Sequence, residues 1–341
     1  MMPGQGKLLG SIALCVLVLN ACRPDHAEVP KEEPLPDLTP PHFPEMPVPE
    51  RAPLTSKRIA LGKKLFFDPI LSRDKTISCG TCHLPHKAFT DGQAVAIGIE
   101  GRKHFRNSPT LFNVAWQPYL FMDGGNPSLE SQVLGPIEEH VEMDLPFTEA
   151  MARVAQHPDY PPLFEEAFGE GVNPFTLTTA LATYQRSLVS AQSHFDRYWN
   201  GDLSALSQEE RKGLDLFKSE ALKCNQCHEL PLTTNFAFEN NGSASESDDD
   251  QGRYRVSLDS ADRGKFKVAT LRNVAFTAPY MHDGSIADLS AVIDHYASGG
   301  QAHLNKSQRV QGFRISDSEK SALLAFLKSL SDTSSYRQFQ P

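Results

Sequence analysis

Two short cysteine motifs constrain this chain more than any other feature: Cys79-Gly80-Thr81-Cys82-His83 and Cys224-Asn225-Gln226-Cys227-His228. A Cys-x-x-Cys-His run is the attachment signal for c-type heme. Its two thiols add to the two vinyl groups along one edge of the porphyrin, and the adjoining His becomes a ligand of the iron. The motifs therefore predict two covalently attached hemes, anchored by the four cysteines and ligated by His83 and His228.

Two other interpretations of these cysteines stay open at this level. All four can ligate one structural zinc ion, although zinc ribbons rarely carry a His directly after both pairs. Either pair can form a redox-active dithiol, which would need a βαβ context that the sequence does not show. No cysteine is left for a structural disulfide, because Cys15 and Cys22 lie in the N-terminal targeting segment.

The first 53 residues have the character of a targeting segment and a tether. Lys7 supplies a positive charge, and the apolar stretch 8–19 is too short to span a bilayer comfortably. The stretch ends in Leu19-Asn20-Ala21-Cys22, which resembles the bacterial lipoprotein cleavage box, in which the Cys becomes the acylated first residue. We predict a signal peptide over 1–21, lipidation at Cys22 and a Pro-rich tether over 22–53. A plain secretory signal with a chance Cys is the alternative.

The charge balance narrows the classes of partner. The chain has 341 residues, with room for two domains of ordinary size, and a formal net charge of −9. An acidic chain offers no basic surface for neutralising phosphates, which argues against nucleic-acid binding and leaves a basic partner protein compatible. The acidic run 246–250 lies among Gly and Ser and is expected to be a solvated loop.

The chain repeats itself around its two cysteine motifs. Residues 110–116, Thr-Leu-Phe-Asn-Val-Ala-Trp, match residues 270–276, Thr-Leu-Arg-Asn-Val-Ala-Phe, at an offset of 160. Upstream of the motifs, residues 62–66 resemble residues 213–217. Because both matches flank the motifs in the same order, we predict two heme domains related by internal duplication.

Hydrophobic spacing predicts a mainly α fold. Six segments carry apolar residues at helical spacing: 57–67, 147–156, 177–189, 207–216, 286–297 and 316–330. Several begin at capping residues, and Ser316-Asp317-Ser318-Glu319 is a capping box. We therefore predict two cytochrome c-like domains, over 54–200 for the first heme and 201–331 for the second, with a tail over 332–341.

Several further runs give the chain a family resemblance. From about residue 54 to residue 330 it resembles the bacterial di-heme cytochrome c peroxidases, including their MauG-like branch. The runs that carry the resemblance are Leu71-Ser72-Arg73, Arg106-Asn107-Ser108-Pro109-Thr110, Asp123-Gly124, Gly135-Pro136, Val141-Glu142-Met143 and Leu271-Arg272-Asn273-Val274-Ala275-Phe276-Thr277-Ala278-Pro279-Tyr280. Both cysteine motifs also lie at the spacing that the family uses.

The resemblance implies a division of labour between the hemes. The first, on His83, would react with peroxide, and the second, on His228, would accept electrons from a donor. Glu142 would be the acid–base residue at the first heme, and Gln132 would be its hydrogen-bonding partner. Without the resemblance Glu142 is one carboxylate among several in an exposed loop.

The resemblance also implies a calcium ion between the domains, in addition to the two covalent hemes. Its ligands would be the side chain of Asn107 and the backbone carbonyls of Thr277 and Pro279. Oxygen ligands of this kind suit a hard cation.

Two departures from the family pattern concern the first heme. Most members carry a distal His in an Ile-Gly-His-Gly run, and the matching run here is Ile97-Gly98-Ile99-Glu100-Gly101. Ile99 cannot ligate iron, so we expect the first heme to be open to peroxide without prior reduction. His104 is a rival ligand, with a surface His as the alternative. Members also place a Trp between the hemes, where this chain has Met122.

A third departure concerns the second heme. Its distal ligand is a Met in most members, whereas the matching position here is Tyr296, as in the MauG-like branch. At the offset of 160 Tyr296 falls on Pro136, which has no ligand atom. The repeat therefore predicts one closed and one open iron. His295 and Met281 are competing ligands, and a Tyr packed in the core is the alternative.

The implied activity is reduction of hydrogen peroxide to water with electrons from a small periplasmic protein, either a cytochrome c or a cupredoxin. The alternatives are a MauG-like oxidase that modifies a partner protein and a non-enzymatic di-heme electron carrier. We expect the chain to be periplasmic and to contact a bacterial membrane only through its lipid. The outer membrane is the preferred prediction. Members of the family often form homodimers, so by analogy a homodimer is compatible with this chain.

Overall fold

The computed structural model describes residues 1, 35, 37–244, 249–335 and 339. The chain divides into two units, Met1–Lys31 and Glu32–Pro341, and every element below belongs to the second. Most of the predicted signal peptide, together with Cys22, lies outside the described residues. No helix in the described ranges has the length and apolar character needed to cross a bilayer.

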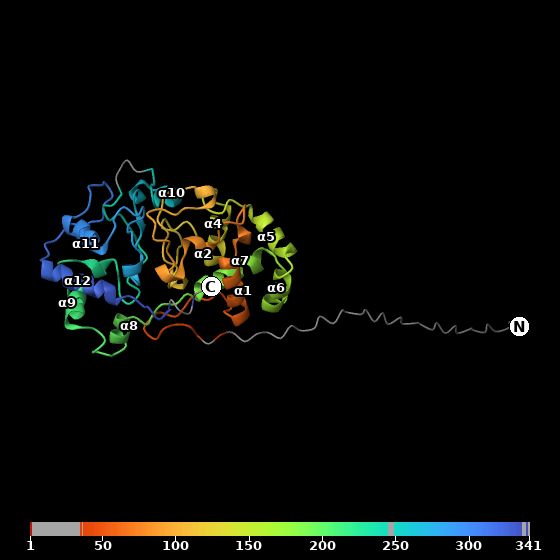
Figure 1. The fold of residues 1–341 in the computed structure, drawn as a ribbon, viewed down its shortest axis with the longest axis horizontal. Coiled ribbons are helices and arrows are strands. Elements are labelled where there is room, and N and C mark those ends of the chain that lie inside the picture. Colours follow the sequence, from red (N-terminus) through yellow and green to blue (C-terminus); the bar gives the residue numbers. More distant parts are fainter. Residues whose placement is uncertain (2–34, 36, 245–248, 336–338, 340–341) are drawn as a thin grey trace. The chain divides into compact units, whose positions relative to one another are not determined.

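The second unit is mainly helical, which confirms the predicted fold class at that level (Figure 1). Its first half contains the helices α1 (Ser56–Phe67), α2 (Cys79–Cys82), α3 (Leu129–Gln132), α4 (Leu134–Glu138), α5 (Phe147–Gln156), α6 (Tyr160–Phe168), α7 (Pro174–Arg186) and α8 (His194–Trp199). Its second half contains α9 (Gln208–Lys218), α10 (Tyr254–Ser257), α11 (Leu289–Ser298) and α12 (Asp317–Ser329). The 3₁₀-helices are η1 (Pro69–Leu71), η2 (Pro85–Lys87), η3 (Ile99–Gly101), η4 (Val114–Trp116), η5 (Cys224–Gln226), η6 (Ser260–Asp262) and η7 (Val274–Phe276). One antiparallel pair joins β1 (Phe238–Glu239) to β2 (Phe266–Lys267).

Side-chain caps set where the longest helices begin. The Asn173 side chain accepts a hydrogen bond from the Thr176 N–H, which starts α7 three residues before the predicted position. The Ser316 hydroxyl accepts from the Glu319 N–H, and α12 begins where the predicted capping box places it. The capping box therefore locates the start of α12, whereas apolar spacing alone places the start of α7 three residues too late.

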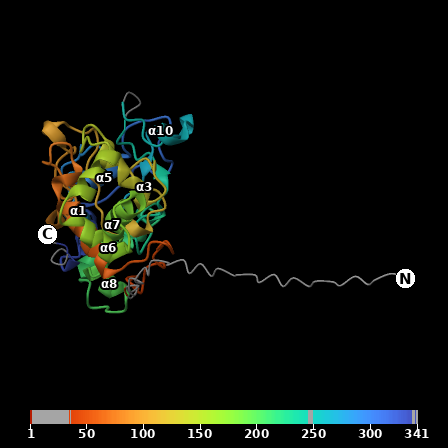
Figure 2. The ribbon, with the colours of Figure 1, turned by 90° about the vertical axis from the view of Figure 1, so that its right-hand side faces the viewer.

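The first half is built around the crossing of α1 and α7. Gly62 lies at the contact, where a Cβ would be 2.0 Å from the Ala180 carbonyl oxygen. Leu65, Phe66 and Tyr184 are buried beside the crossing. Figure 2 shows α1 and α7 together with α5 and α6. A glycine is required here because a larger residue would push the two helices apart.

The second half has the same kind of crossing, between α9 and α12. A Cβ on Gly213 would be 2.0 Å from the Ala322 carbonyl oxygen, and Phe326 packs there as Tyr184 does in the first half. This common requirement for close approach explains why the two runs upstream of the cysteine motifs resemble each other.

The repeated asparagines of the two halves meet at one serine. Asn113 and Asn273 both adopt left-handed conformations, with φ of 58° and 61°, and each precedes a 3₁₀-helix. The Asn113 side chain donates to the Ser190 carbonyl oxygen at 2.8 Å. The Asn273 side chain donates to the Ser190 hydroxyl at 2.9 Å. Equivalent residues of the repeat therefore hold the segment that connects the halves.

Residues 37–53, the C-terminal part of the predicted tether, are packed onto the fold, and we call them the N-terminal strap. Phe43 and Met46 are buried in one cluster with Trp116 of the first half and Leu232 of the second. The Trp116 indole donates to the Pro44 carbonyl oxygen at 2.8 Å. A Pro-rich composition indicates an extended chain but not what that chain contacts, so it did not distinguish a strap from a tether.

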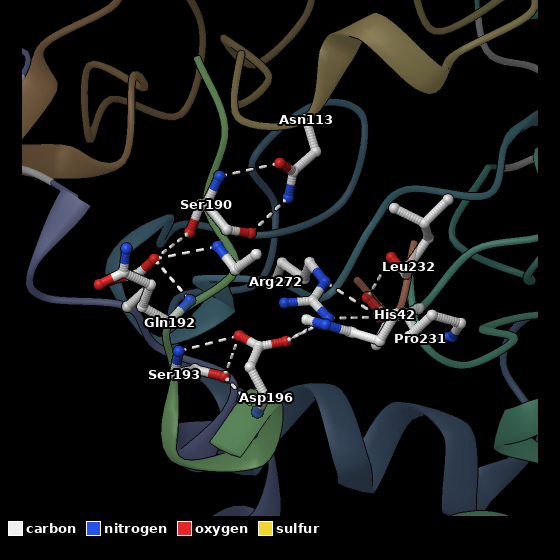
Figure 3. Close-up of polar contacts among 12 residues, drawn as sticks. His42, Asn113, Ser190, Gln192, Ser193, Asp196, Pro231, Leu232 and Arg272 are labelled. Carbon is white, nitrogen blue, oxygen red and sulfur yellow. Dashed lines mark hydrogen bonds and ion pairs between the residues drawn. The ribbon is translucent and has the colours of Figure 1, made fainter. Parts of the chain in front are cut away.

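A buried charge cluster fastens the strap (Figure 3). His42 Nε2 donates to Asp196 Oδ1 at 2.7 Å, and the Arg272 guanidinium lies 2.7 Å from the same oxygen. The Arg272 guanidinium also lies over the Phe43 ring, 4.6 Å from its centroid. Burial alone would raise the pKa of Asp196. The hydrogen bond from His42 and the charge of Arg272 outweigh burial and hold this pKa well below its ordinary value. The carboxylate is therefore ionised and joins the strap to both halves.

Candidate functional site

The first cysteine motif forms one helical turn. The His83 N–H donates to the Cys79 carbonyl oxygen at 3.0 Å, directly after α2. His83 Nδ1 donates to the Phe89 carbonyl oxygen at 2.8 Å. This contact places the ring proton on Nδ1 and leaves Nε2 available for an iron. The motif therefore fits a covalently anchored heme with a proximal His.

The second motif forms a 3₁₀ turn, η5, that is closed by the equivalent backbone hydrogen bond. The His228 N–H donates to the Cys224 carbonyl oxygen at 2.9 Å. His228 Nδ1 lies 3.2 Å from the Thr233 carbonyl oxygen and 3.1 Å from that of Ala269. As in the first motif, a backbone carbonyl fixes the tautomer and leaves Nε2 as the ligand atom.

The thiols do not have the character of redox or zinc-binding cysteines. Burial raises the pKa of Cys79, Cys82 and Cys224 to about 12, which disfavours their thiolates. Within the described part of the chain, no group of three or more His, Cys, Asp or Glu side chains is placed to hold a metal ion. The two pairs therefore do not meet in a four-cysteine zinc centre, and the heme interpretation fits best.

Glu142 lies near the first motif. The N–H of the fully buried Ile99 donates to the Glu142 carbonyl oxygen at 2.8 Å. Burial, followed by the charge of Glu139, raises the pKa of the Glu142 carboxyl to about 7. Burial raises the pKa of the Cys82 thiol, and the charges of Asp91 and Glu142 add to the rise, so the carboxyl is within electrostatic reach of the motif. A carboxyl that titrates near neutral pH is suited to accept and return a proton.

Pro136 and Gln132, the other two residues predicted near the first iron, have fewer contacts that bear on their predicted roles. The Pro136 carbonyl oxygen accepts the Met143 N–H at 3.1 Å, which puts Pro136 next to the Glu142 segment. Its side chain has no ligand atom. Gln132 ends α3 and is half-buried, and the described side chains of Gln132 and Glu142 share no hydrogen bond. The partnership of Gln132 with Glu142 therefore stays a prediction.

Tyr296 lies near the second motif. Its hydroxyl accepts a hydrogen bond from Asn241 Nδ2 at 3.2 Å. Burial raises the pKa of the Tyr296 phenol; the Asn241 hydrogen bond opposes this, and the Cys224 and Cys227 thiols add to it. Tyr296 also lines a cavity with Leu222, just before the motif. The phenol is thus in the same electrostatic relation to the second motif as Glu142 is to the first.

The rival ligands of the second iron meet at the same asparagine. Asn241 Nδ2 also donates to Met281 Sδ at 3.2 Å, and His295 Nε2 donates to the Asn241 carbonyl oxygen at 3.0 Å. One ring nitrogen of His295 is therefore engaged, whereas Tyr296 and Met281 receive hydrogen bonds from one amide. Nothing in the sequence identifies Asn241, because the residues that it contacts, Met281, His295 and Tyr296, lie 40 to 55 positions further along the chain.

The predicted calcium ligands lie on adjoining segments. The Asn107 N–H donates to the carbonyl oxygen of His282 at 2.7 Å, and His282 follows Pro279 by three positions. Asn107 Nδ2 donates to the Gln93 carbonyl oxygen at 2.7 Å, which leaves Oδ1 for a cation. Among the described contacts, none involves that Oδ1 or the carbonyl oxygens of Thr277 and Pro279. An amide oxygen and two carbonyl oxygens fit calcium.

Arg106 forms a buried ion network beside these segments. Its guanidinium lies 2.8 Å from Asp123 Oδ2 and makes two hydrogen bonds to Asp250, of 2.6 and 2.8 Å. All three side chains are at most 9% exposed. Asp250 therefore corrects the expectation that the acidic run 246–250 is wholly solvated, because a buried guanidinium needs carboxylate partners. Residues 246–248 lie outside the described part.

Lys267 joins the two halves next to Met122, a role that an isolated Lys in the sequence does not indicate. The Lys267 N–H donates to the Met122 carbonyl oxygen at 2.7 Å. Its Nζ donates to the Tyr119 carbonyl oxygen at 2.7 Å and to the Gln117 side chain. Burial lowers the pKa of Lys267 to about 7, against the opposing charge of Asp123. Lys267 therefore ties the second half to the segment of the first half that carries Tyr119 and Met122.

Comparisons with known proteins converge on one family. A family model described as di-haem cytochrome c peroxidase matches residues 56–204. A methylamine utilization protein MauG from Methylorubrum extorquens is 38% identical over 287 residues, which cover 84% of this chain and 81% of that protein. A cytochrome-c peroxidase, IdrP1, from a Pseudomonas species is 35% identical and covers 87% of this chain and 86% of that protein.

A solved structure agrees with these relatives. The crystal structure of a MauG-like protein associated with microbial copper homeostasis has a TM-score of 0.81 and 33% identity, over 87% of this chain and 96% of that one. The diheme peroxidase BthA from Burkholderia thailandensis has a TM-score of 0.72 at 23% identity, over 83% of this chain and 87% of that one, which shows likeness of fold.

Proposed function

Because this chain belongs to the di-heme cytochrome c peroxidase family, which includes proteins named MauG, we propose that it reduces hydrogen peroxide to water. The observation that carries the proposal is the asymmetry between its two motifs. The first has Glu142, a carboxyl with a pKa of about 7, within electrostatic reach, while Ile99 and Pro136 offer no ligand atom. The second has a phenol, Tyr296, in the same relation. One site is suited to proton transfer and the other to ligation.

The residues divide the work as follows. When bound, heme supplies the electron-transfer chemistry, and the protein supplies attachment, ligation and proton movement. His83 and His228 would each hold an iron through Nε2, because Nδ1 of each ring lies against a backbone carbonyl. Glu142 would accept a proton from one peroxide oxygen and return it to the other, which would leave as water. In one cycle a peroxide, two protons and two electrons give two waters, with the electrons drawn from two molecules of a reduced cytochrome c or cupredoxin.

We also propose the properties that the fold implies around this activity. Both hemes are covalent, through the thiols of the two motifs. Calcium is held by Asn107, Thr277 and Pro279, and the fit of their three oxygens supports it. The chain is periplasmic and is attached by a lipid on Cys22 to a bacterial membrane, the outer membrane rather than the inner one. Two protomers can associate as in other family members.

A MauG-like oxidase is the second candidate function. Tyr296 is the observation that favours it, because it stands where most members have a Met, and a relative named MauG is 38% identical. In this role the protein would use peroxide equivalents to oxidise a residue on a partner protein. Met122, which replaces the Trp between the hemes, argues against it.

The test of the function uses the fully oxidised protein with both hemes attached. It is expected to react with peroxide without prior reduction, because no side chain at Ile99 or Pro136 closes the first iron. Stopped-flow absorption measures this reaction, and oxidation of reduced cytochrome c measures turnover. Reaction with peroxide but no oxidation of any small donor would favour the oxidase. A spectrum of low-spin six-coordinate heme alone, unchanged by peroxide, would show an electron carrier.

Tyr296→Met tests the asymmetry at the second iron. A phenolate ligand stabilises the oxidised state, so replacement by the neutral thioether should raise the reduction potential of one heme. It should also create the weak long-wavelength absorption of Met-to-iron charge transfer. Potentiometric titration followed by absorption measures both effects, with Tyr280→Phe as a control tyrosine whose hydroxyl donates to the Val274 carbonyl oxygen. An unchanged potential and spectrum would assign the ligand to Met281 or His295.

A further inference from the structure

His104 lies near Glu142 with one ring nitrogen already used. Its Nδ1 accepts a hydrogen bond from the Arg106 N–H at 2.9 Å. An accepting Nδ1 carries no proton, so in the neutral ring the proton is on Nε2. Nε2 lies 3.7 Å from Glu142 Oε1. The backbone therefore fixes a tautomer whose donor faces the carboxyl.

The surroundings keep His104 neutral and in place. Its side chain is 16% exposed, and its ring stacks on Phe105 with centroids 4.4 Å apart. Burial and the charge of Arg106 are the main causes that lower the pKa of His104. The charged groups that face the ring are Arg106, Arg255, Glu139, Asp250 and Glu142. The imidazole thus acts as a fixed donor rather than as a group that charges near neutral pH.

We propose that His104 is a positioning residue, which holds its Nε2–H toward Glu142 and keeps that carboxyl ionised so that it can take a proton from peroxide. The inference rests on the proposed role of Glu142 and adds the group that prepares it. It also accounts for both ring nitrogens of His104 without iron ligation.

The physical need for such a donor follows from the position of Glu142. The Glu142 carboxyl is 34% exposed, and its partial burial beside a second carboxylate, Glu139, favours the protonated form, which cannot act as a base. A hydrogen-bond donor favours the charged form. The distance of 3.7 Å exceeds a direct hydrogen bond, but catalytic contacts are often long before substrate binds, and one water can bridge such a gap.

Two substitutions at this position separate the two ring nitrogens. His104→Asn retains an oxygen that can accept the Arg106 N–H, as in an Asx-turn, but it cannot reach Glu142. His104→Gln retains a donor near the position of Nε2. His140→Asn is the matched control, because His140 also lies next to a carboxylate, Glu139, but is 70% exposed.

The expected effect is a shift in the titration of Glu142. In His104→Asn the pH below which the peroxide reaction slows should rise by about one unit, while His104→Gln should recover most of that shift and His140→Asn should show none. Infrared difference titration of the holoprotein without peroxide, with Glu142→Gln as the blank, should show the same shift in the carboxyl band.

The outcomes distinguish this inference from the proposed function. If the carboxyl band and the pH profile are the same in His104→Asn as in the parent, His104 does not prepare Glu142 and the inference is overturned. If the carboxyl band shifts but the rate of the peroxide reaction is the same in the His104 and Glu142 variants as in the parent, the contact exists but the proposed role of Glu142 is wrong. If all three His variants shift equally, the effect is general electrostatics, which also overturns the inference.

Discussion

Replacing both Cys79 and Cys82 by Ala is expected to leave one covalent heme and to abolish peroxide reduction. The two thiols attach the first heme, and only this motif has the Glu142 carboxyl within electrostatic reach. His83 can still bind iron, but a heme held by one axial bond is lost on extraction with acidic acetone, unlike one held by thioethers. Two measurements check this result: the number of hemes that resist extraction, and the turnover of peroxide with reduced cytochrome c.

The mirror variant, in which Cys224 and Cys227 are both Ala, is the control for this experiment. It should also retain one covalent heme, yet its remaining iron should still react with peroxide. Its turnover with cytochrome c should fall, because the site that receives electrons is lost. A first-motif variant that still reduces peroxide, beside a second-motif variant that does not react, would reverse the assignment of the two hemes.

Glu142→Gln is expected to slow the peroxide reaction by at least about a hundredfold, within the range of about 10² to 10⁴ that positioned acid–base groups contribute. Gln preserves the size and polarity of the side chain but cannot accept the proton. Both hemes should stay attached, since Glu142 contacts neither motif covalently. Stopped-flow measurement of the first peroxide step detects the change before any effect of the donor.

The pH dependence gives a second signature of Glu142. Its pKa is raised to about 7, so the carboxyl is protonated and inactive as a base below that pH. The parent rate should therefore fall about tenfold per unit below pH 7, and this limb should be absent in Glu142→Gln. Glu139→Gln is the matched control: its side chain is 47% exposed, so it should keep most of the rate and move the limb to lower pH. A loss of rate in Glu139→Gln alone would show that the family match is misregistered in this loop.

Helices with local signals could be located from the sequence, and those without them could not. α5 has the predicted bounds, 147–156, because its apolar spacing and its start after a Pro are both local. α6 was not expected, since Pro161 and Pro162 resemble helix breakers. They occupy the first turn, where the missing N–H groups have no helical partner to lose.

Residues of the site were predictable only where chemistry requires a motif. The two cysteine motifs identify their own function, and their His residues have the geometry that the motif predicts. The partners of Arg106 were not predictable, because Asp250 is 144 positions away and belongs to a run that resembles a solvated loop. The proximity of His104 to Glu142 was likewise invisible, since no periodicity links the two segments.

The strap has a consequence for the order in which this chain folds. Its His42–Asp196 contact closes a loop of 154 positions, and its Arg272 contact closes a longer one. Closing such loops is entropically unfavourable, and long-range contacts form slowly. The surface that receives the strap also combines Trp116 with Leu232, so it is complete only when both halves have joined. The segment that is synthesised early is therefore expected to dock last, and its docking marks a molecule whose assembly is finished.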